Sequence, residues 1–170
     1  NQLSLFSFQT ISTDSPEFQE RHQQVVNRLR QMVSDLRPAM LEYGFHLGLE
    51  GLVDDLAERF ANGSAISFEL PAADFRYDAN VEKHLYRIVQ QACENAFRHG
   101  QAKNIRVSGS LEPEKIHLAI ADDGVGFKLE HSDFSHLLAE KHFGLAGMDE
   151  RAGLIGADLK IVSAPGEGTR

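Results

Sequence analysis

The sequence predicts an α+β fold: a two-layer sandwich in which a mixed sheet is covered by helices on one face. The clearest indication is the segment 81–99, where apolar residues recur with the 3.6-residue period of a helix. Two stretches of alternating apolar and polar residues, 105–111 and 115–121, flank Glu112-Pro113-Glu114 and predict an antiparallel hairpin. Helices and strands in this order favour helices packed on a sheet.

The first 40 residues differ from the rest in their pattern of apolar residues. Residues 16–37 are expected to form a helix that Pro16 begins and Pro38 ends. Four of its apolar residues alternate four- and three-residue spacings, as in a helix bundle: Val26, Leu29, Val33 and Leu36. Together with the apolar piece 3–8, this helix predicts a partial dimerisation hairpin and linker over residues 1–40. Such a hairpin needs a second copy to bury its faces.

The second domain is expected to span residues 41–170. Residues 47–60 indicate an amphipathic helix and residues 66–70 a strand that Pro71 ends. Residues 145–155 indicate a further helix, and residues 158–163 are expected to form a strand. The polar stretch 128–142 has no clear period, and we interpret it as a mobile lid.

Composition narrows the class of protein. A formal net charge of −8 disfavours a nucleic-acid partner, because such proteins need a positive surface. Cys93 is the only cysteine, which excludes an intrachain disulfide, and its apolar helical surroundings predict a buried thiol. No apolar run reaches the length of a membrane span or a signal peptide. We therefore expect a cytoplasmic fragment, which leaves open a membrane anchor in the parent protein.

Four motifs that suit a nucleotide pocket follow one another in the second half of the chain. Glycines punctuate loops in every protein, so each motif alone is weak, but their order is hard to obtain by chance. A buried Asn and an Asp that opens a Gly-x-Gly loop predict a pocket for a divalent metal and an adenine ring. The motifs are Asn95, Asp122-Asp123-Gly124-Val125-Gly126-Phe127, Gly144-Leu145-Ala146-Gly147-Met148 and Ala164-Pro165-Gly166-Glu167-Gly168-Thr169.

With these motifs, Asp35-Leu36-Arg37-Pro38 and the stretch 86–90, the chain resembles two-component sensor histidine kinases. The resemblance is to the branch of nitrate, membrane-fluidity and cell-wall-stress sensors. It implies the Bergerat ATP-binding fold of the GHKL superfamily, shared with gyrase, Hsp90 and MutL, with ATP and Mg²⁺ as cofactors. It also implies a homodimer that transfers the γ-phosphoryl group to a His of a phosphoacceptor helix. From there the group passes to an Asp of a response regulator.

The resemblance assigns roles at the adenine and metal ends of the pocket. Asn95 matches the family's magnesium ligand, and Asp122 matches the residue that accepts a hydrogen bond from the adenine amine. A carboxylate offers only acceptors, so it selects an amino-bearing purine. Gly124 and Gly126 are expected to let the backbone approach the base. Phe127 is expected to build a pocket wall.

Further residues match the phosphate end. Gly144, Leu145 and Gly147 begin the helix 145–155, whose free amides suit phosphate oxygens. Three other residues match family positions that contact phosphate, line the pocket or bond near the adenine: Arg98, His99 and Thr169.

Two departures from the family pattern matter. Gln91 stands where relatives carry Glu, and Gln cannot accept a proton. This disfavours a gyrase-like ATPase and fits a transferase, in which Gln91 still offers an oxygen toward the metal. No residue matches the phosphoacceptor box, because His22 precedes Gln23-Gln24 on the second hairpin helix. Two alternatives stay open: a catalytically degenerate nucleotide-binding dimer scaffold, and an anti-sigma-type protein serine kinase, which the linker 35–38 disfavours.

Overall fold

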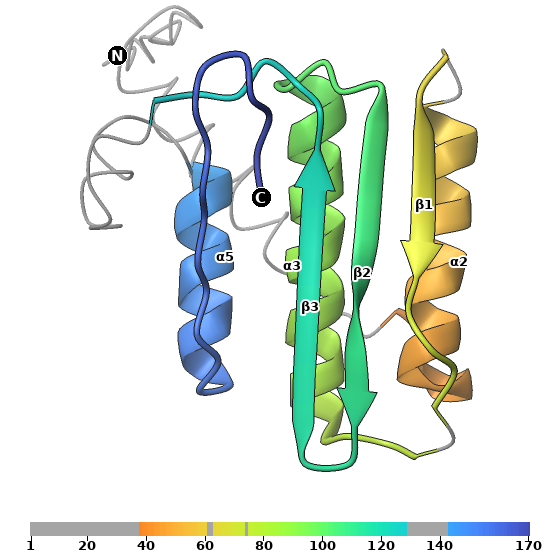
Figure 1. The fold of residues 1–170 in the computed structure, drawn as a ribbon. Coiled ribbons are helices and arrows are strands. Elements are labelled where there is room, and N and C mark those ends of the chain that lie inside the picture. The colour runs from red at the N-terminus through yellow and green to blue at the C-terminus, as the bar shows by residue number, and fades with distance from the viewer. Residues whose placement is uncertain (1–37, 61–62, 74, 129–142) are drawn as a thin grey trace, which may run out of the picture. The chain divides into compact units, whose positions relative to one another are not determined.

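The computed structural model describes residues 38–60, 63–73, 75–128 and 143–170, and residues 38–170 form a compact unit. Its elements are η1 (Ala39–Tyr43), α2 (Phe45–Arg59), β1 (Ala65–Glu69), α3 (Ala79–Arg98), β2 (Asn104–Glu112), β3 (Lys115–Asp122) and α5 (Phe143–Leu154) (Figure 1). The helix expected over 16–37, the piece 3–8, and residues 129–142 of the expected lid lie outside the described residues. The division into domains 1–40 and 41–170 stays a prediction. None of the described helices is long and apolar enough to span a membrane.

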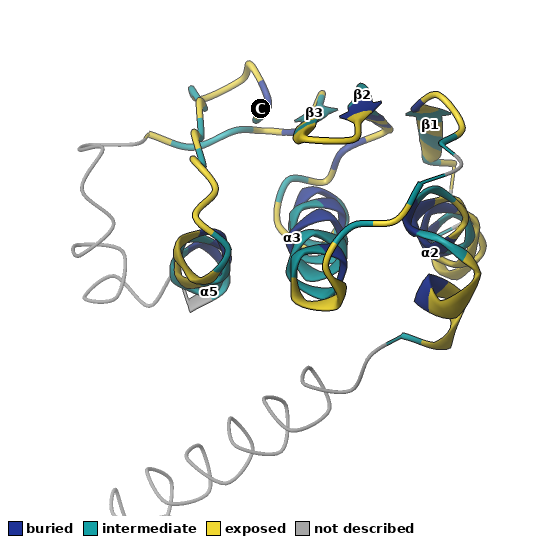
Figure 2. Cartoon of the chain, turned by 90° about the horizontal axis from the view of Figure 1, so that it is seen from below, coloured by how far each residue is buried: buried dark blue, intermediate teal, exposed yellow. Residues whose placement is uncertain are grey.

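The three strands form a mixed sheet in the order β1-β2-β3. β1 pairs parallel with β2, from Ala65 opposite Asn104 onward, and β2 pairs antiparallel with β3. The helices α2, α3 and α5 lie side by side on one face of this sheet (Figure 2). The predicted α+β fold, the two layers and the hairpin around Pro113 are therefore confirmed.

The long helix α3 carries most of the site and is well defined at both ends. Asp78 caps its start by accepting a hydrogen bond from the Asn80 N–H over 2.8 Å. At its end, the N–H of Gly100 donates to the Asn95 carbonyl over 3.0 Å. The predicted helix 81–99 thus begins two residues earlier than expected and ends where Gly100 stops it.

Two apolar clusters hold the helices to the sheet and to each other. The larger one joins α2, α3 and β2, and includes Phe45, Leu49, Leu56, Val89, Cys93, Ile105 and Val107. The smaller one joins α3 and α5 through Ile88, Leu145, Met148 and Ala152. The face of α3 is therefore shared between two packing partners, and the cavity described below opens beside the smaller cluster.

A buried carboxylate ties η1 to the first turn of α3. The Glu82 side chain is fully buried, and Arg76 donates to both of its oxygens over 3.0 and 2.9 Å. The same guanidinium donates to the carbonyls of Leu41, over 2.8 Å, and Glu42, over 3.1 Å. The Tyr77 N–H also donates to Glu82, over 3.2 Å. We call Arg76 and Glu82 with these partners the Arg76–Glu82 clamp.

One predicted element is wrong. Residues 158–163 form no strand, and only Ser163 makes an isolated bridge, to Thr169. Val162 and Arg170 exchange backbone hydrogen bonds of 2.6 and 2.8 Å, but residues 158–161 make none that the structure records. The alternation instead places Leu159 and Ile161 on the same side of the segment, where both pack on the α3–α5 cluster. The pattern is that of a strand, but a strand needs a backbone partner, and within the described ranges residues 158–161 have none.

Candidate functional site

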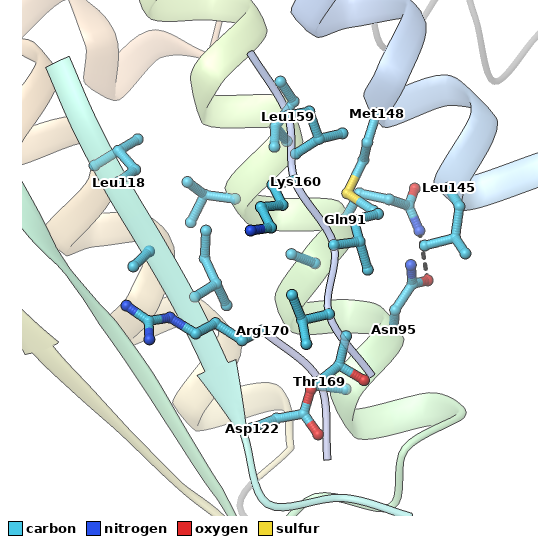
Figure 3. A pocket seen from close by; sticks show the side chains of 18 of the residues that line it. Gln91, Asn95, Leu118, Asp122, Leu145, Met148, Leu159, Lys160, Thr169 and Arg170 are labelled. Carbon is cyan, nitrogen blue, oxygen red and sulfur yellow. Dashed lines mark hydrogen bonds between the residues drawn. The ribbon is translucent and has the colours of Figure 1, made fainter. Parts of the chain in front are cut away.

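A cavity of about 1120 Å³ lies between α3, β3, α5 and the C-terminal segment (Figure 3). It collects nine of the predicted site residues from separate elements: Gln91, Asn95, His99, Asp122, Gly126, Phe127, Gly144, Leu145 and Thr169. Arg98, Gly124 and Gly147 are not part of its lining. The structure therefore brings most of the predicted site residues to one cavity, and their roles stay predictions.

At one end of the cavity, two side-chain amides of α3 face the start of α5. Gln91 Nε2 donates a hydrogen bond to Asn95 Oδ1 over 2.8 Å, as Figure 3 shows. A Cβ on Gly144 would lie 3.2 Å from Gln91 Nε2 and 3.3 Å from Asn95 Nδ2. The start of α5 comes this close to α3 because Gly144 has no side chain. The cavity therefore has amide oxygens on one wall and helical N–H groups on the other.

The other end is formed by the last residue of β3. One oxygen of Asp122 accepts a hydrogen bond from the Gly124 N–H over 2.8 Å, and its backbone N–H donates to the Thr169 carbonyl over 2.9 Å. Within the described ranges, no hydrogen bond to the second carboxylate oxygen is recorded. Figure 3 shows the side chains of Asp122 and Thr169 side by side at the cavity. Asp122 thus presents an oriented acceptor to whatever enters.

Ser163 holds the C-terminal wall together. Its hydroxyl accepts a hydrogen bond from the Phe127 N–H over 3.0 Å and donates to the Gly168 carbonyl over 2.8 Å. It also lies 3.0 Å from the hydroxyl oxygen of Thr169. The loop that follows Asp122 is therefore joined to residues 163–169 by polar contacts as well as by packing.

The two glycines of the Asp122 loop serve different purposes. Gly126 has a φ of 58°, and a Cβ there would overlap the Ala164 carbonyl and lie 2.8 Å from the Gly168 carbonyl. Gly124 is buried, and a Cβ on it would lie 2.5 Å from the Gly100 carbonyl. Gly126 lines the cavity, and its predicted role beside the base stays a prediction. Gly124 instead lets the loop pack against the turn that follows α3.

Asp123 has a structural role that sequence reasoning missed. One of its oxygens accepts hydrogen bonds from the N–H groups of Lys103 and Asn104, both over 2.8 Å. The other accepts from the Asn104 side-chain amide over 2.7 Å. The bonds from Asn104 and Lys103 lower the pKa of the Asp123 carboxyl. This role is hard to predict from the sequence, because the donors Lys103 and Asn104 lie about one hairpin earlier in the chain.

Arg98 lies outside the cavity in this structure. Its guanidinium lies 5.5 Å from the ring centre of Phe60, and its Nε lies 3.8 Å from Glu94 Oε2. Phe60 in turn stacks on Phe97, with ring centres 4.7 Å apart. Successive helical residues point about 100° apart, so His99 lines the cavity while Arg98 faces α2. The predicted phosphate contact of Arg98 has no support from this placement.

The sequence did not single out the apolar half of the cavity. It is lined by Leu85, Ile88, Val89, Ala92, Ile116, Leu118, Ile120, Met148, Leu159 and Ile161. The periods of α3 and β3 do place most of these residues on inward faces, which is the signal that was available. In the structure these residues border the cavity.

Comparisons with known proteins identify the family of this chain. The sequence model of the family described as "Histidine kinase-, DNA gyrase B-, and HSP90-like ATPase" matches residues 80–170. Sensor histidine kinase LiaS of Bacillus subtilis (strain 168) is 33% identical over 144 residues, which cover 85% of this chain and 38% of LiaS. Sensor protein VraS of Staphylococcus haemolyticus is 31% identical over 156 residues, covering 91% and 42%. The chain thus spans less than half the length of these curated relatives.

Two solved structures resemble the fold. The histidine kinase domain of the Erythrobacter litoralis EL346 blue-light activated histidine kinase has a TM-score of 0.59 at 17% identity, covering 74% of this chain and 57% of that one. Acinetobacter baumannii histidine kinase AdeS has a TM-score of 0.54 at 15% identity, covering 91% and 82%. At such identities the likeness concerns the fold alone. Since the matched residues 80–170 make up more than half of the sequence and include both ends of the cavity, the chain belongs to the family of histidine kinase-, DNA gyrase B- and HSP90-like ATPases.

Proposed function

We propose that this chain binds Mg-ATP in the cavity and acts as the catalytic domain of a sensor histidine kinase. The observation that carries the proposal is the meeting of Asn95, Asp122, Gly126, Gly144 and Thr169 around one cavity. These residues come from α3, β3, α5 and two loops, and each offers a group that suits one part of a nucleotide. The curated relatives, which are named sensor kinases, support the choice of activity.

Asp122 is the residue that we propose recognises adenine. Its carboxylate has only acceptor oxygens, so it favours the exocyclic amine of adenine over the keto group of guanine. A buried acceptor left without its donor costs about 1–3 kcal/mol, which sets the size of the discrimination. Thr169 lies beside it, held by Ser163, and Gly126 leaves space where any side chain would overlap the Ala164 carbonyl.

The start of α5 is the proposed phosphate site. The first N–H groups of a helix have no intrahelical partners, and the helix dipole favours negative charge there. Gly144 and Leu145 bring this end of α5 to the cavity wall opposite Asn95. Backbone amides therefore supply the attraction for an anion in a protein whose formal net charge is −8.

Asn95 is the proposed protein ligand of Mg²⁺. Oxygen donors suit this ion, and Asn95 Oδ1 accepts a hydrogen bond from Gln91 while keeping a second lone pair. Among the described residues there is no group of three or more His, Cys, Asp or Glu that could hold a metal. Phosphate oxygens and water would therefore complete the shell, as is usual for Mg²⁺. When bound, the ion supplies charge neutralisation at the phosphates.

The proposed reaction is transfer of the γ-phosphoryl group to a His imidazole. No residue of this sequence matches the phosphoacceptor box, so the acceptor is a His on a dimerisation helix outside these residues. A cognate response regulator then receives the group on an Asp, and the kinase acts as a homodimer. Gln91 cannot take a proton from water, which favours transfer to the His over hydrolysis.

Calorimetric titration tests the pocket. Mg-ADP and Mg-GDP are titrated into the wild-type chain, Asp122→Asn and, as a matched control, Asp123→Asn, whose carboxylate faces Asn104 and not the cavity. We expect micromolar affinity for Mg-ADP, about −8 kcal/mol, weaker binding of Mg-GDP, and loss of the adenine preference in Asp122→Asn alone. Equal affinity for both nucleotides in the wild type would refute the assignment of Asp122.

A second experiment separates the kinase from the scaffold alternative, which Gln91 keeps open. Chain loaded with γ-labelled ATP is mixed with an acceptor hairpin from a sensor kinase, beside a Gln91→Glu variant. Label on the hairpin His supports the kinase. If both proteins bind nucleotide and neither labels the hairpin, the nucleotide-binding scaffold becomes the better description.

A further inference from the structure

Three polar side chains lie in a row at the Asp122 end of the cavity. Thr169 forms antiparallel bridges to Asp122 on one side and to Ser163 on the other. Residues that face each other across such a bridge place their side chains on the same face. The Thr169 side chain therefore lies between the carboxylate of Asp122 and the hydroxyl of Ser163. Asp122 and Thr169 line the cavity, whereas Ser163 is not part of its lining.

The Ser163 hydroxyl has two partners whose roles are fixed by their chemistry. The Phe127 N–H can only donate, and its nitrogen lies 3.0 Å from the Ser163 oxygen. The Gly168 carbonyl can only accept, and its oxygen lies 2.8 Å away. A hydroxyl has one proton and two lone pairs. Ser163 therefore directs its proton to Gly168 and one lone pair to Phe127, and a single lone pair is left for a third partner.

The third partner is Thr169, and the direction of this hydrogen bond follows from the other two. The hydroxyl oxygens of Ser163 and Thr169 lie 3.0 Å apart, and by distance alone either could donate. Because the Ser163 proton already points to Gly168, the bond forms only if Thr169 is the donor. The Thr169 hydroxyl thus directs its proton away from Asp122. Toward the cavity it offers lone pairs only.

We propose that Ser163 is a positioning residue for recognition of the base, because it fixes the Thr169 hydroxyl as a hydrogen-bond acceptor toward the cavity. The inference rests on the proposed function and adds to it the group that the base must carry. Asp122 and Thr169 then present acceptors only, and each takes one N–H of the exocyclic amine of adenine. A keto group in its place brings lone pairs toward two acceptors and gains no hydrogen bond.

A purely structural role for Ser163 predicts a different result. Ser163 joins the loop at Phe127 to Gly168, so its loss also loosens this wall of the cavity. A looser wall weakens the binding of every nucleotide, whereas a change in the donor role of Thr169 alters the preference between an amino and a keto base. The ratio of two dissociation constants therefore separates the two roles. The suitable pair is Mg-ADP and Mg-IDP (inosine diphosphate), because hypoxanthine carries a keto group where adenine carries its amino group.

Calorimetric titration of both nucleotides into the wild-type chain and three single variants tests the inference. We expect the ratio Kd(IDP)/Kd(ADP) to fall about tenfold in Ser163→Ala, because Thr169 can then turn its O–H toward the keto oxygen. Ser163→Thr keeps the hydroxyl and should keep the wild-type ratio. Thr169→Val leaves the contacts of Ser163 with Phe127 and Gly168 in place. It should also lower the ratio, because it removes one acceptor of the amine.

The variant that carries both Ser163→Ala and Thr169→Val completes a double-mutant cycle. Without the Thr169 hydroxyl, loss of the Ser163 hydroxyl should leave the ratio as it is in Thr169→Val. An unchanged ratio in Ser163→Ala or in Thr169→Val, or an equal fall caused by Ser163→Ala in both backgrounds, would overturn the inference and leave the proposed function standing. A wild-type chain that binds neither nucleotide would instead refute the proposed function, and this inference with it.

Discussion

Gln91 Nε2 donates a hydrogen bond to Asn95 Oδ1 over 2.8 Å, one turn further along α3. Gly144 lies against both amides, so neither can rotate freely into the space beside α5. In this chain the Gln91 amide donor therefore orients Oδ1 of the proposed metal ligand. Gln91 therefore positions the Asn95 side chain, and it also cannot act as a general base toward water.

Replacement of Gln91 by Glu should redirect the chemistry toward water. The carboxylate can accept a proton from water, and we expect ATP hydrolysis without an acceptor His to rise by up to about 100-fold. Phosphate release measures this rate. Gln90→Glu is the control. This substitution adds the same charge, but Gln90 lies outside the cavity, where it hydrogen-bonds Arg87 and Glu94. Equal hydrolysis rates in the two variants would contradict the role of Gln91.

Gly126→Ala should remove nucleotide binding and lower stability by about 1–3 kcal/mol, because the new Cβ overlaps the Ala164 carbonyl. Gly156→Ala is the matched control. Gly156 has a similar φ, 65°, but nothing lies within 4 Å of its Cβ position. It should cost about 1–2 kcal/mol from the backbone alone and leave Mg-ADP binding intact. Urea unfolding and calorimetry report the two effects separately.

Asp123→Ala should destabilise the fold in a pH-dependent manner. The pKa of the Asp123 carboxyl is lower in the folded chain than the ordinary value near 3.9. Its contribution is therefore present above about pH 4 and is lost as the pH falls through the folded pKa. The difference in free energy of unfolding between wild type and Asp123→Ala should shrink on acidification, as measured by urea titration.

Cys93 should be unreactive in the folded chain. Burial raises the pKa of its thiol to about 12, so the nucleophilic thiolate is scarce at pH 8. Above the ordinary pKa near 8.5, the unfolded thiol ionises while the folded one stays protonated, so this contribution to stability falls as the pH rises toward 12. A maleimide should label Cys93 only after urea unfolds the chain. Rapid labelling without urea would show that the α2–α3 core opens.

Arg76→Met should destabilise the chain more than Arg59→Met. The first substitution leaves the fully buried Glu82 without the cation that faces it, whereas Arg59 pairs with the exposed Asp55. Thermal unfolding of both variants at neutral pH measures the difference. Equal Tm values would mean that the Arg76–Glu82 clamp adds nothing to stability.

Local patterns predicted much of this fold because the elements concerned are defined by their own residues. The period of α3 and the alternation of the β2–β3 hairpin need no information about distant segments. The strand expected over 158–163 failed because pairing is a property of two segments, and among the described residues none pairs with 158–161. Arg98 and Asp123 show the same limit for the site. Their surroundings are set by Phe60 of the segment after α2 and by Asn104 at the start of β2, far along the sequence.

The Arg76–Glu82 clamp couples η1 to α3, and through α3 to the nucleotide end of the cavity. Residues 39–43 are fastened to its first turn, while Asn95 lies in its last turn, about 20 Å away at 1.5 Å per residue. Backbone hydrogen bonds join successive turns of an α-helix, so a displacement of its first turn also moves its last turn. A force applied at Pro38 would therefore displace Asn95 relative to α5. The Arg76–Glu82 ion pair would limit how much force reaches α3 before η1 and α3 separate.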